Sequence, residues 1–376
     1  MDIGINASYL ELTRAGVARF IVNLLKTWPA IYPNHRFHLY FRKSIPNDDF
    51  LNNKNFVKKL VACPSLLNKA SVWENFYLPQ TVAREKSIDV FFSPSYTLPM
   101  FLRCKKKVVT IFDISYISHP EWYPRNIRWH YNIPTFFTAR NADMIVTSSN
   151  FSKQEIVSYL KVDEKKVQVV YLAADKEFRL ASDPELAAKI KKKFTKGRNY
   201  LFFLGLLIQR RNITPLLKAF KKNLAEDPLR CALLLAGANR TYPYIDINKA
   251  IKTLGLEKDV FWHSYIEDAD LPAIYNGAKA FIYPSSYEGF GIPPLEAMSS
   301  GVPVITAGLS SLPEVVGDAA YLLKDPGNVD EMAEAMKNVL NDKILRATMI
   351  ENGLRQAKKF SWQETACKTM KILSEI

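Results

Sequence analysis

Short apolar runs alternate with amphipathic stretches along most of the chain. Runs such as Tyr200–Leu204 and Ala280–Tyr283 have the length and composition of strands that are buried on both faces. Between them, stretches such as Ile213–Phe220 place apolar residues at helical spacing. Strands that alternate with helices indicate parallel sheets covered by helices. Since 376 residues exceed one typical core, the pattern predicts an α/β protein with two doubly wound domains.

The same pattern divides the chain into two halves of similar design. Strands are predicted at residues 2–6, 89–92, 108–112, 142–149 and 166–170, then at 200–204, 231–236, 260–266 and 280–283, and Leu322 closes the second sheet. Residues 40–80 are less regular, and a helix at 73–79, ending at a proline, is predicted there. Helices fill 328–358. The predicted division is a first domain at 1–178, a second domain at 179–358 and a C-terminal helix at 359–376.

Residues 283–304 contain the most informative chemistry of the chain. A strand ends at Tyr283, a turn with Gly289 and Gly291 follows, and two prolines indicate the start of a short helix. The glycines leave backbone N–H groups open at the positive end of that helix, which makes an anion site. Glu288 precedes the turn, and Glu296 is expected in the first helical turn. Each carboxylate can accept hydrogen bonds from two vicinal hydroxyls, as a nucleotide sugar would require. The alternative is that the helix dipole stabilises the acidic residues without any ligand.

The chain is basic, with 51 Lys and Arg against 37 Asp and Glu and a net charge of +14. Residues 1–175 carry 23 Lys and Arg against 14 Asp and Glu, a net charge of +9. Such a half can attract nucleic acid, anionic lipid or a phosphate-bearing acceptor. The chain has no helix-turn-helix, RNP or zinc-finger pattern, which argues against nucleic acid.

Aromatic and basic side chains are interleaved in residues 121–137, where Trp122 and Trp129 accompany Arg125 and Arg128. This mixture is typical of a surface that docks on an anionic membrane, because rings and cations are both stabilised at the interface. Packing of one helix in the core is the simpler explanation. The pattern leaves both interpretations open, and peripheral membrane attachment is one of the two expectations.

Several function classes are disfavoured by what the sequence lacks. No G-x-G-x-x-G follows a predicted strand, which argues against a nicotinamide cofactor. The four cysteines are scattered without a C-x-x-C pair, which excludes a local zinc or redox motif and fits a reducing compartment. No signal peptide and no apolar run of roughly 18–20 residues is visible. The expected location is therefore the cytoplasm.

The segment from Glu288 to Glu296, EGFGIPPLE, resembles the E-x7-E signature of retaining glycosyltransferases, and the chain resembles glycosyltransferase family 4 of the bacterial polysaccharide and mannosyltransferase type. The resemblance implies a GT-B fold of two facing Rossmann-like domains, of which the first, 1–178, binds the acceptor and the second, 179–358, binds the nucleotide sugar. The C-terminal helix, 359–376, crosses back and packs on the first domain. It implies transfer of a hexose from a UDP- or GDP-sugar to an acceptor hydroxyl of a glycan or lipid-linked acceptor, without a metal or other cofactor. The implied pathways are surface polysaccharide, lipopolysaccharide or glycolipid synthesis. The alternatives are a nucleotide-sugar 2-epimerase or a non-catalytic binder of the same fold.

The resemblance also implies roles for individual residues. Gly205 and the Gln209-Arg210-Arg211-Asn212 stretch are similar to the family's Gly…Arg-Lys-Asn motif, so Arg210 and Arg211 would bind the diphosphate. The amides of Gly289, Phe290, Gly291 and Ile292 would assist, Glu288 would hold donor-sugar hydroxyls and Glu296 the ribose. Tyr265 and Ile266 would lie beside the nucleobase. Gly16 would lie in the inter-domain cleft that binds the donor and the acceptor.

Asp113 and Glu288 are the expected catalytic residues, again by resemblance. The family commonly has a His-Asp pair after the strand that precedes Asp113, and here the histidine position is Phe112. This departure leaves Asp113 as the polar candidate at that position.

Overall fold

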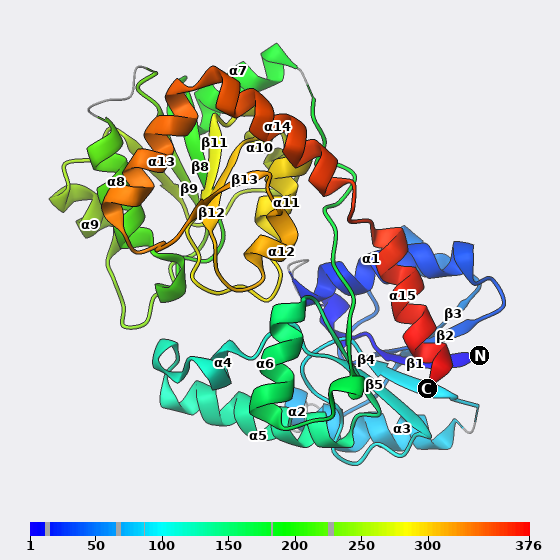
Figure 1. Ribbon diagram of the computed structural model, residues 1–376. Helices are drawn as coiled ribbons and strands as arrows, with labels where there is room; N and C mark the ends of the chain where they lie inside the picture. Colours follow the sequence, from blue (N-terminus) through cyan, green and yellow to red (C-terminus); the bar gives the residue numbers. More distant parts are fainter. Residues whose placement is uncertain (12–15, 65–68, 86, 182, 225–228) are drawn as a thin grey trace. The chain divides into compact units, whose positions relative to one another are not determined.

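The computed structural model describes residues 1–11, 16–64, 69–85, 87–181, 183–224 and 229–376, which form two compact units (Figure 1). The first unit comprises Met1–Pro120, Arg125–Leu172 and Ser361–Ile376. The second unit comprises Glu121–Pro124 and Ala173–Phe360. Each unit has its own parallel sheet and its own buried core.

The first unit is built on a parallel sheet in the order β3-β2-β1-β4-β5-β6-β7. Its strands are β1 (Asp2–Asn6), β2 (Arg36–Phe41), β3 (Phe56–Leu60), β4 (Val90–Ser93), β5 (Lys106–Thr110), β6 (Met144–Thr147) and β7 (Val167–Val169). The helices are α1 (Val17–Ile31), α2 (Ala70–Val72), α3 (Leu78–Arg84), α4 (Ser115–Ser118), α5 (Arg125–Asn141), α6 (Asn150–Leu160) and α15 (Trp362–Glu375). The strand order reverses between β1 and β4, the kind of point at which α/β sheets bind ligands.

Large apolar side chains fix the first unit's layers. All four residues of β4 are buried, and α1 buries the stripe that contains Phe20, Leu24 and Trp28. The Trp28 ring stacks on Phe37 of β2 at 5.3 Å, and its Nε1 donates to the backbone oxygen of Ala366 in α15 at 2.9 Å. The C-terminal helix is therefore part of the first unit, although the residues before it belong to the second.

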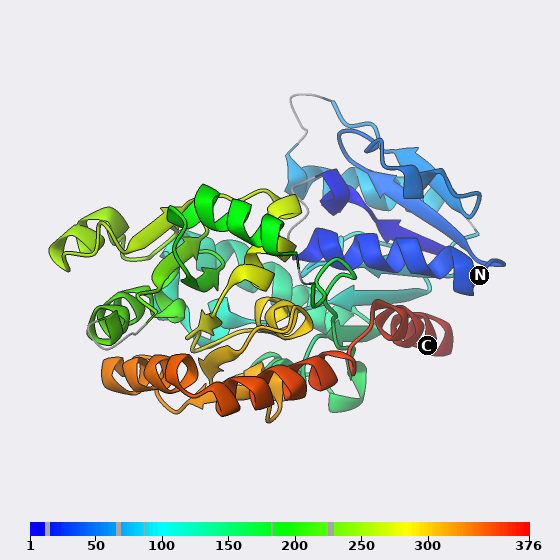
Figure 2. The ribbon, with the colours of Figure 1, turned by 90° about the horizontal axis from the view of Figure 1, so that it is seen from above.

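The second unit is built on a parallel sheet in the order β10-β9-β8-β11-β12-β13. Its strands are β8 (Tyr200–Leu204), β9 (Ala232–Ala236), β10 (Val260–His263), β11 (Ala280–Tyr283), β12 (Val304–Ala307) and β13 (Ala320–Leu323). The helices are α7 (Pro184–Thr195), α8 (Ile213–Leu224), α9 (Ile247–Thr253), α10 (Leu271–Gly277), α11 (Ile292–Ser299), α12 (Leu312–Val316), α13 (Val329–Asn341) and α14 (Lys343–Ala357). Figure 2 shows α13 and α14 following one another along one side of this unit.

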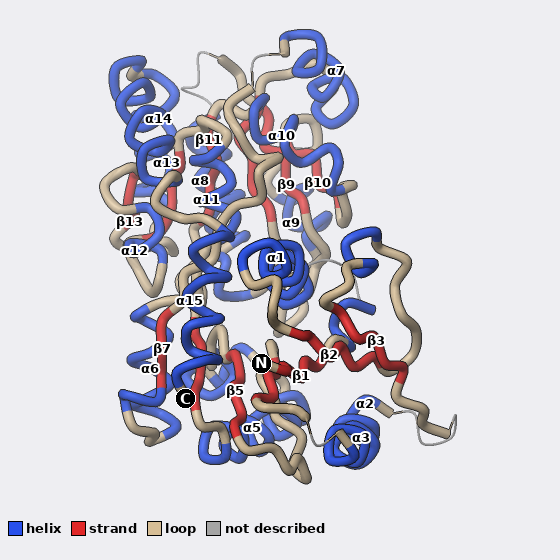
Figure 3. Tube along the Cα trace, turned by 90° about the vertical axis from the view of Figure 1, so that its right-hand side faces the viewer, coloured by secondary structure: helices blue, strands red, loops and turns tan. Residues whose placement is uncertain are grey.

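Two parts of the first unit differ from the expectation. The less regular region 40–80 contains β3, and β2 before it was also not predicted; Figure 3 shows β1, β2 and β3 side by side. The predicted helix at 73–79 does not end at Pro79. Residues Trp73–Tyr77 form a π-helical turn, η4, and α3 continues through Pro79, which lies in its first turn, where a missing N–H is tolerated.

Among the described residues, no helix combines the length and apolar character that a bilayer span requires.

Candidate functional site

The candidate site lies at the carboxyl edge of the second sheet, where the strand order reverses. β8 and β11 are neighbours there, and β9 and β12 continue in opposite directions, so the loops after β8 and β11 diverge. Gly205 follows β8 directly, with φ of +143°. A side chain at this position would collide with the Arg211 guanidinium, so glycine allows the arginine to lie against the loop.

The loops after β8 and β11 are hydrogen-bonded to each other. Arg210 and Arg211 lie in a short 3-10 turn, η7 (Gln209–Arg211), just before α8. The side-chain amide of Asn212 donates to the Pro284 oxygen at 2.9 Å and to Ser286 Oγ at 2.8 Å, and the Ser286 N–H donates to the Arg210 oxygen at 2.8 Å. The arginines are thereby fixed opposite the loop that carries Glu288.

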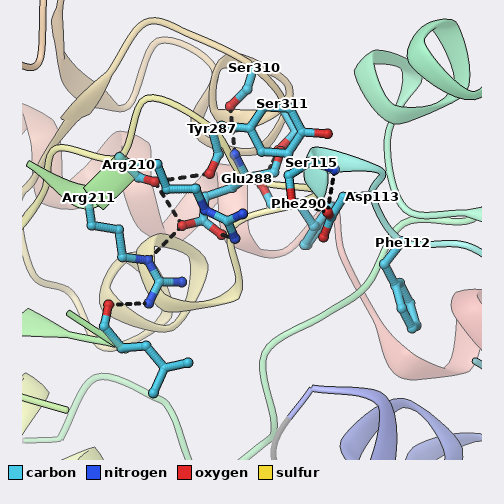
Figure 4. A network of polar contacts seen from close by, with 12 residues as sticks. Phe112, Asp113, Ser115, Arg210, Arg211, Tyr287, Glu288, Phe290, Ser310 and Ser311 are labelled. Atoms are coloured by element: carbon cyan, nitrogen blue, oxygen red, sulfur yellow. Dashed lines mark hydrogen bonds and ion pairs between the residues drawn. The ribbon is translucent and has the colours of Figure 1, made fainter. Parts of the chain in front are cut away.

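Glu288 is buried at the centre of this arrangement and pairs with both arginines (Figure 4). Its Oε1 accepts hydrogen bonds from Arg211 Nε at 2.9 Å, from the Tyr283 hydroxyl at 2.8 Å and from the Ser285 hydroxyl at 2.9 Å. Its Oε2 lies 3.8 Å from Arg210 Nη2. One carboxylate oxygen is therefore fully engaged by the protein, while the other is beyond hydrogen-bond distance of its cation.

The surroundings of Glu288 keep it ionised. Burial alone would raise the pKa of this carboxyl, but the charges of Arg211 and Arg210, with hydrogen bonds from Arg211 and Tyr283, outweigh burial and lower the pKa to about 2. The Arg211 guanidinium also lies over the Tyr283 ring, with Cζ 5.2 Å from the ring centroid. The result is a buried, fixed pair of opposite charges at the carboxyl edge of the second sheet.

Because of this ion pair, we expect the free energy of unfolding to fall as the pH is lowered through the acidic range. The pKa of Glu288 in the folded chain is about 2 against an ordinary 4.5, so its stabilising contribution is full above pH 4.5 and disappears as the pH falls towards 2. The pKa difference corresponds to about 3 kcal/mol, of which about 2 kcal/mol should be gone at pH 3. Urea unfolding at pH 6 and pH 3 should show this loss in the wild type and a smaller one in Glu288→Gln. An equal loss in both proteins would show that Glu288 does not carry the effect.

Two serines after β12 hold the loop that carries Glu288. The Glu288 N–H donates to Ser310 Oγ at 3.1 Å, and Ser311 Oγ contacts the backbone oxygens of Glu288 and Phe290, each at 2.7 Å. Neither serine was predicted as a site residue. In the sequence, only the position of these serines shortly after a strand of the same sheet could have indicated them.

Glu296 lies in the second turn of α11, not in the first as predicted, because the helix begins at Ile292. Gly291 precedes the helix with φ of +117°, a conformation that suits glycine. Glu296 is 2% exposed, and its Oε2 accepts a hydrogen bond from the Tyr275 hydroxyl of α10 at 3.0 Å. The two glutamates of the motif are thus both buried, and each accepts a hydrogen bond from a tyrosine hydroxyl, while Glu288 also pairs with two arginines.

Tyr265 and Ile266 follow β10, two strands from β8 in the sheet. Tyr265 is exposed and Ile266 is buried. Adjacent strands lie about 4.8 Å apart, so these residues are about 10 Å along the sheet from β8. This spacing fits a ligand longer than a diphosphate.

The segment Glu121–Pro124 belongs to the second unit and contacts the arginine side of the site. The Tyr123 hydroxyl accepts a hydrogen bond from Arg210 Nη1 at 3.1 Å, and the Trp122 ring meets the Tyr287 ring edge-on at 5.8 Å. The Arg210 guanidinium also lies over Tyr287, with Cζ 5.5 Å from the centroid. From the sequence, Trp122 and Tyr123 were considered as membrane or core residues and not as part of this site.

Gly16 and Asp113 lie in the first unit. Gly16 precedes α1 with φ of +56°. Asp113 Oδ1 accepts hydrogen bonds from the backbone N–H and the hydroxyl of Ser115, at 3.0 and 2.7 Å, and Oδ2 accepts one from the Tyr96 hydroxyl at 3.3 Å. Phe112 packs edge-on against Phe20 at 5.3 Å. The side chain that replaces the family histidine is therefore an apolar packing residue.

Among the residues that the structure describes, no group of three His, Cys, Asp or Glu side chains is placed to hold a metal ion. The groups brought together in the second unit are instead two cations and two carboxylates, with hydroxyls around them. Such a set can bind a diphosphate and polyhydroxylated groups side by side.

Both halves of the chain match models of glycosyltransferase families. Residues 14–178 match the model of Glycosyltransferase Family 4, and residues 186–356 match that of Glycosyl transferases group 1. The O-antigen chain mannosyltransferase B of Escherichia coli is 32% identical over 295 residues, which cover 75% of this chain and 73% of the relative. The serotype-specific mannosyltransferase WbdA of Escherichia coli is 31% identical over 60% of this chain, which spans only 28% of that longer relative.

Among solved structures, Anabaena Alr3699/HepE in complex with UDP-glucose superposes with a TM-score of 0.73 and 17% identity, over 100% of this chain and 99% of that chain. At this identity the likeness shows the fold alone. The predicted GT-B fold, with two Rossmann-like units and a C-terminal helix that returns to the first, is confirmed. The protein is a glycosyltransferase, and the chain belongs to the group 1 glycosyltransferases, with the Glycosyltransferase Family 4 domain in its first half.

Proposed function

We propose that the protein transfers a hexose, mannose in the first instance, from a nucleoside diphosphate sugar to a hydroxyl of a surface glycan, with retained anomeric configuration and at the cytoplasmic side of the membrane. The observation that carries the proposal is the buried Glu288–Arg211 pair at the switch point of the second sheet, within an E-x7-E motif. Both Escherichia coli relatives named above are mannosyltransferases, and one of them is named for the O-antigen chain, which supports the choice of sugar and acceptor.

Each part of the donor has a partner in this proposal. Oε1 of Glu288 is engaged by the protein, so Oε2 accepts the hydroxyls of the donor sugar. Arg210 and Arg211 bind the diphosphate together with the amides of residues 289–292, and they neutralise the charge that develops on the leaving group without a metal. Glu296 accepts the ribose hydroxyls, and Tyr265 and Ile266 flank the base.

A donor screen followed by a transfer assay tests the proposal. Melting temperatures with GDP, UDP, ADP and their sugars identify the donor, because binding to the folded state raises the melting temperature. The chosen donor is then incubated with mannose-terminated oligosaccharides in the presence of EDTA, and NMR of the product reports the anomeric configuration. Transfer with inversion would overturn the retaining mechanism, and loss of transfer in EDTA would overturn the metal-free one. A change of the donor sugar without acceptor would indicate an epimerase, and binding without turnover a non-catalytic protein.

The first half of α5 supports peripheral docking on an anionic membrane. Trp129 and Ile133 are 69% and 59% exposed, although both are large and apolar. With Arg125 and Arg128 they line a surface hollow of about 520 Å³, completed by Asn132 and Phe136. Rings and cations on one exposed surface suit an interface of acyl chains and anionic headgroups. Membrane docking and core packing of a helix were the two interpretations of this stretch, and the exposed side chains in the first half of α5 favour docking.

We predict that Trp129→Ala with Arg128→Gln weakens binding to vesicles that contain anionic lipid. Each basic residue near such a surface contributes about 1 kcal/mol, so the pair of changes should reduce partitioning at least fivefold. Flotation with vesicles of graded anionic content measures this effect. Ile344→Ala removes a side chain that is 81% exposed on α14 and serves as the matched control. Binding that ignores lipid charge and salt would contradict the docking surface and leave the transferase proposal standing.

A further inference from the structure

The segment Glu121–Pro124, which we name the aromatic segment, packs with the second unit, although the residues before and after it belong to the first. A 3-10 turn, η5 (Pro120–Trp122), leads into it, and Pro124 ends it. A proline fixes its own φ and restricts the preceding residue to extended conformations. The backbone of the aromatic segment therefore has few alternatives, and holding it against the second unit costs little conformational entropy.

The two arginines of the candidate site are held in different ways. Arg211 Nε donates to Glu288 Oε1 at 2.9 Å, and its Nη1 donates to a backbone oxygen of the loop after β8 at 3.0 Å. Arg210 instead contacts aromatic residues: Nη1 donates to the Tyr123 hydroxyl at 3.1 Å, and Cζ lies 5.5 Å from the centroid of the Tyr287 ring. The position of Arg210 thus depends on the aromatic segment, which is distant in sequence from both motifs of the site.

The Tyr287 ring connects the aromatic segment to the loop that carries Glu288. Tyr287 is buried and directly precedes Glu288. The Trp122 ring meets it edge-on at 5.8 Å, an arrangement that aromatic pairs prefer. The aromatic segment therefore contacts Arg210 directly through Tyr123, and it supports through Trp122 the ring over which the guanidinium lies.

A neutral hydroxyl is a suitable partner for an arginine that has to bind an anion. Arg210 Nη2 lies 3.8 Å from Glu288 Oε2, beyond hydrogen-bond distance, so this ion pair does not fix the orientation of the guanidinium. The Tyr123 hydroxyl orients it without cancelling its charge. An arginine side chain has many rotamers, and ordering it only when the ligand arrives would reduce the affinity. A guanidinium that is already oriented can offer its N–H groups to phosphate oxygens without that cost.

We propose that Tyr123 is a positioning residue of the donor site. Its hydroxyl, together with the Tyr287 ring that Trp122 supports, holds the Arg210 guanidinium where it meets the diphosphate. The inference rests on the proposed function, because it assumes the diphosphate role of Arg210. It assigns part of the donor affinity to the aromatic segment, which acts through Arg210.

Tyr123→Phe tests this role, because it removes the hydroxyl and keeps the ring. For the nucleoside diphosphate that the donor screen selects, we expect the dissociation constant to rise roughly three- to tenfold, the effect of one hydrogen bond, while that of the nucleoside stays within about twofold. In an Arg210→Met background, Tyr123→Phe should cause no further loss. Calorimetry measures these affinities. Tyr200→Phe is the matched control, since it removes a hydroxyl that donates to the Ile274 oxygen at 2.6 Å, at the amino end of β8, and it should leave both affinities unchanged.

Chemical labelling tests the contact without any nucleotide. Phenylglyoxal modifies guanidinium groups, and mass spectrometry reports the rate at each arginine. We expect Arg210 to react at least about threefold faster in Tyr123→Phe than in the wild type, because the hydrogen bond no longer restrains it. Arg198, whose Nη1 donates to Asp259 at 2.7 Å, should react equally in both proteins.

The two measurements distinguish this inference from the proposed function. If labelling shows the expected difference but the wild type binds no nucleoside diphosphate, the donor chemistry is wrong and Tyr123 still holds Arg210. Equal labelling of Arg210 in both proteins would overturn the positioning role. The same conclusion would follow if Tyr123→Phe left the diphosphate affinity of a binding-competent protein unchanged, weakened nucleoside and diphosphate equally, or caused the same loss in the Arg210→Met background.

Discussion

Replacing Arg211 by methionine is expected to lower the free energy of unfolding by about 3–5 kcal/mol, the usual cost of leaving one member of a buried ion pair alone. Glu288 is only 8% exposed, and Arg211 Nε donates to its Oε1 at 2.9 Å. Without this guanidinium the carboxylate loses its nearest charge, and Arg210 is too far, at 3.8 Å, to replace the hydrogen bond. Urea denaturation at pH 7 measures the loss. Diphosphate binding should fall in the same variant far more than nucleoside binding, because the lost group is the proposed diphosphate ligand.

The double variant Arg211→Met with Glu288→Gln distinguishes a buried pair from a general packing effect. It contains no buried carboxylate at this position, so we expect it to recover most of the stability while transfer activity stays absent. Lys193→Met is the control, since Lys193 pairs with Asp270 at 2.6 Å but is 53% exposed. An exposed pair of this kind contributes at most about 1 kcal/mol. If Arg211→Met were no less stable than Lys193→Met, Glu288 would not depend on Arg211.

The hydrophobic pattern predicted the strands of the second unit better than those of the first. Tyr200–Leu204 and Ala280–Tyr283 are central strands that are covered on both faces, so they appear as continuous apolar runs. β3 is an edge strand of sequence FVKKL, in which only the first residue is buried. Lysines on an edge strand protect it against pairing with another chain, and they also remove the apolar signal. This is why region 40–80 looked irregular.

Arg211 and Glu288 were both singled out from the sequence, but their pairing was not predicted. From the sequence, Arg211 was assigned to a diphosphate and Glu288 to sugar hydroxyls, each on its own motif. The two are 77 positions apart, and they meet because β8 and β11 are adjacent in the sheet. Local patterns do not contain strand order, so the ion pair and the low pKa of Glu288 could not be derived. Tyr123 and Ser310 were missed for the same reason, since each reaches the site from a distant segment.

Asp113 illustrates a limit of the resemblance. The motif suggested a catalytic carboxylate beside a missing histidine. In the first unit, Asp113 Oδ1 receives two hydrogen bonds from Ser115 at the start of α4, which is the geometry of a residue that organises a turn. Its second oxygen accepts a hydrogen bond from the Tyr96 hydroxyl, and the Tyr96 ring packs edge-on against Tyr116 at 6.3 Å. A catalytic role of Asp113 stays a prediction, and these contacts show what the turn would lose if the residue were replaced.

Glu296→Gln is expected to weaken the binding of the nucleoside diphosphate by roughly 1.5–3 kcal/mol, or about 10- to 150-fold, the size of hydrogen bonds to a charged group. The change keeps the shape of the side chain but removes the negative charge that would accept two ribose hydroxyls. The Glu296 side chain is held in place, because Oε2 accepts a hydrogen bond from the Tyr275 hydroxyl at 3.0 Å and its helix, α11, begins directly after the N-cap Gly291. Isothermal titration calorimetry with the nucleotide selected by the donor screen measures the effect.

A second titration separates ribose binding from the support of the helix. Tyr275→Phe removes the hydroxyl partner of Glu296 and leaves the carboxylate charged, so we expect a loss of at most about 1.5 kcal/mol in nucleotide affinity, the value of a single neutral hydrogen bond. The wild type should bind the 2′-deoxynucleotide more weakly than the nucleotide. Glu296→Gln should bind the two with similar affinity, because the variant has already lost the interaction with the 2′-hydroxyl. If Glu296→Gln bound the nucleotide as tightly as the wild type, or lost the same affinity for the ribose and 2′-deoxyribose forms, the carboxylate would support α11 rather than the ribose.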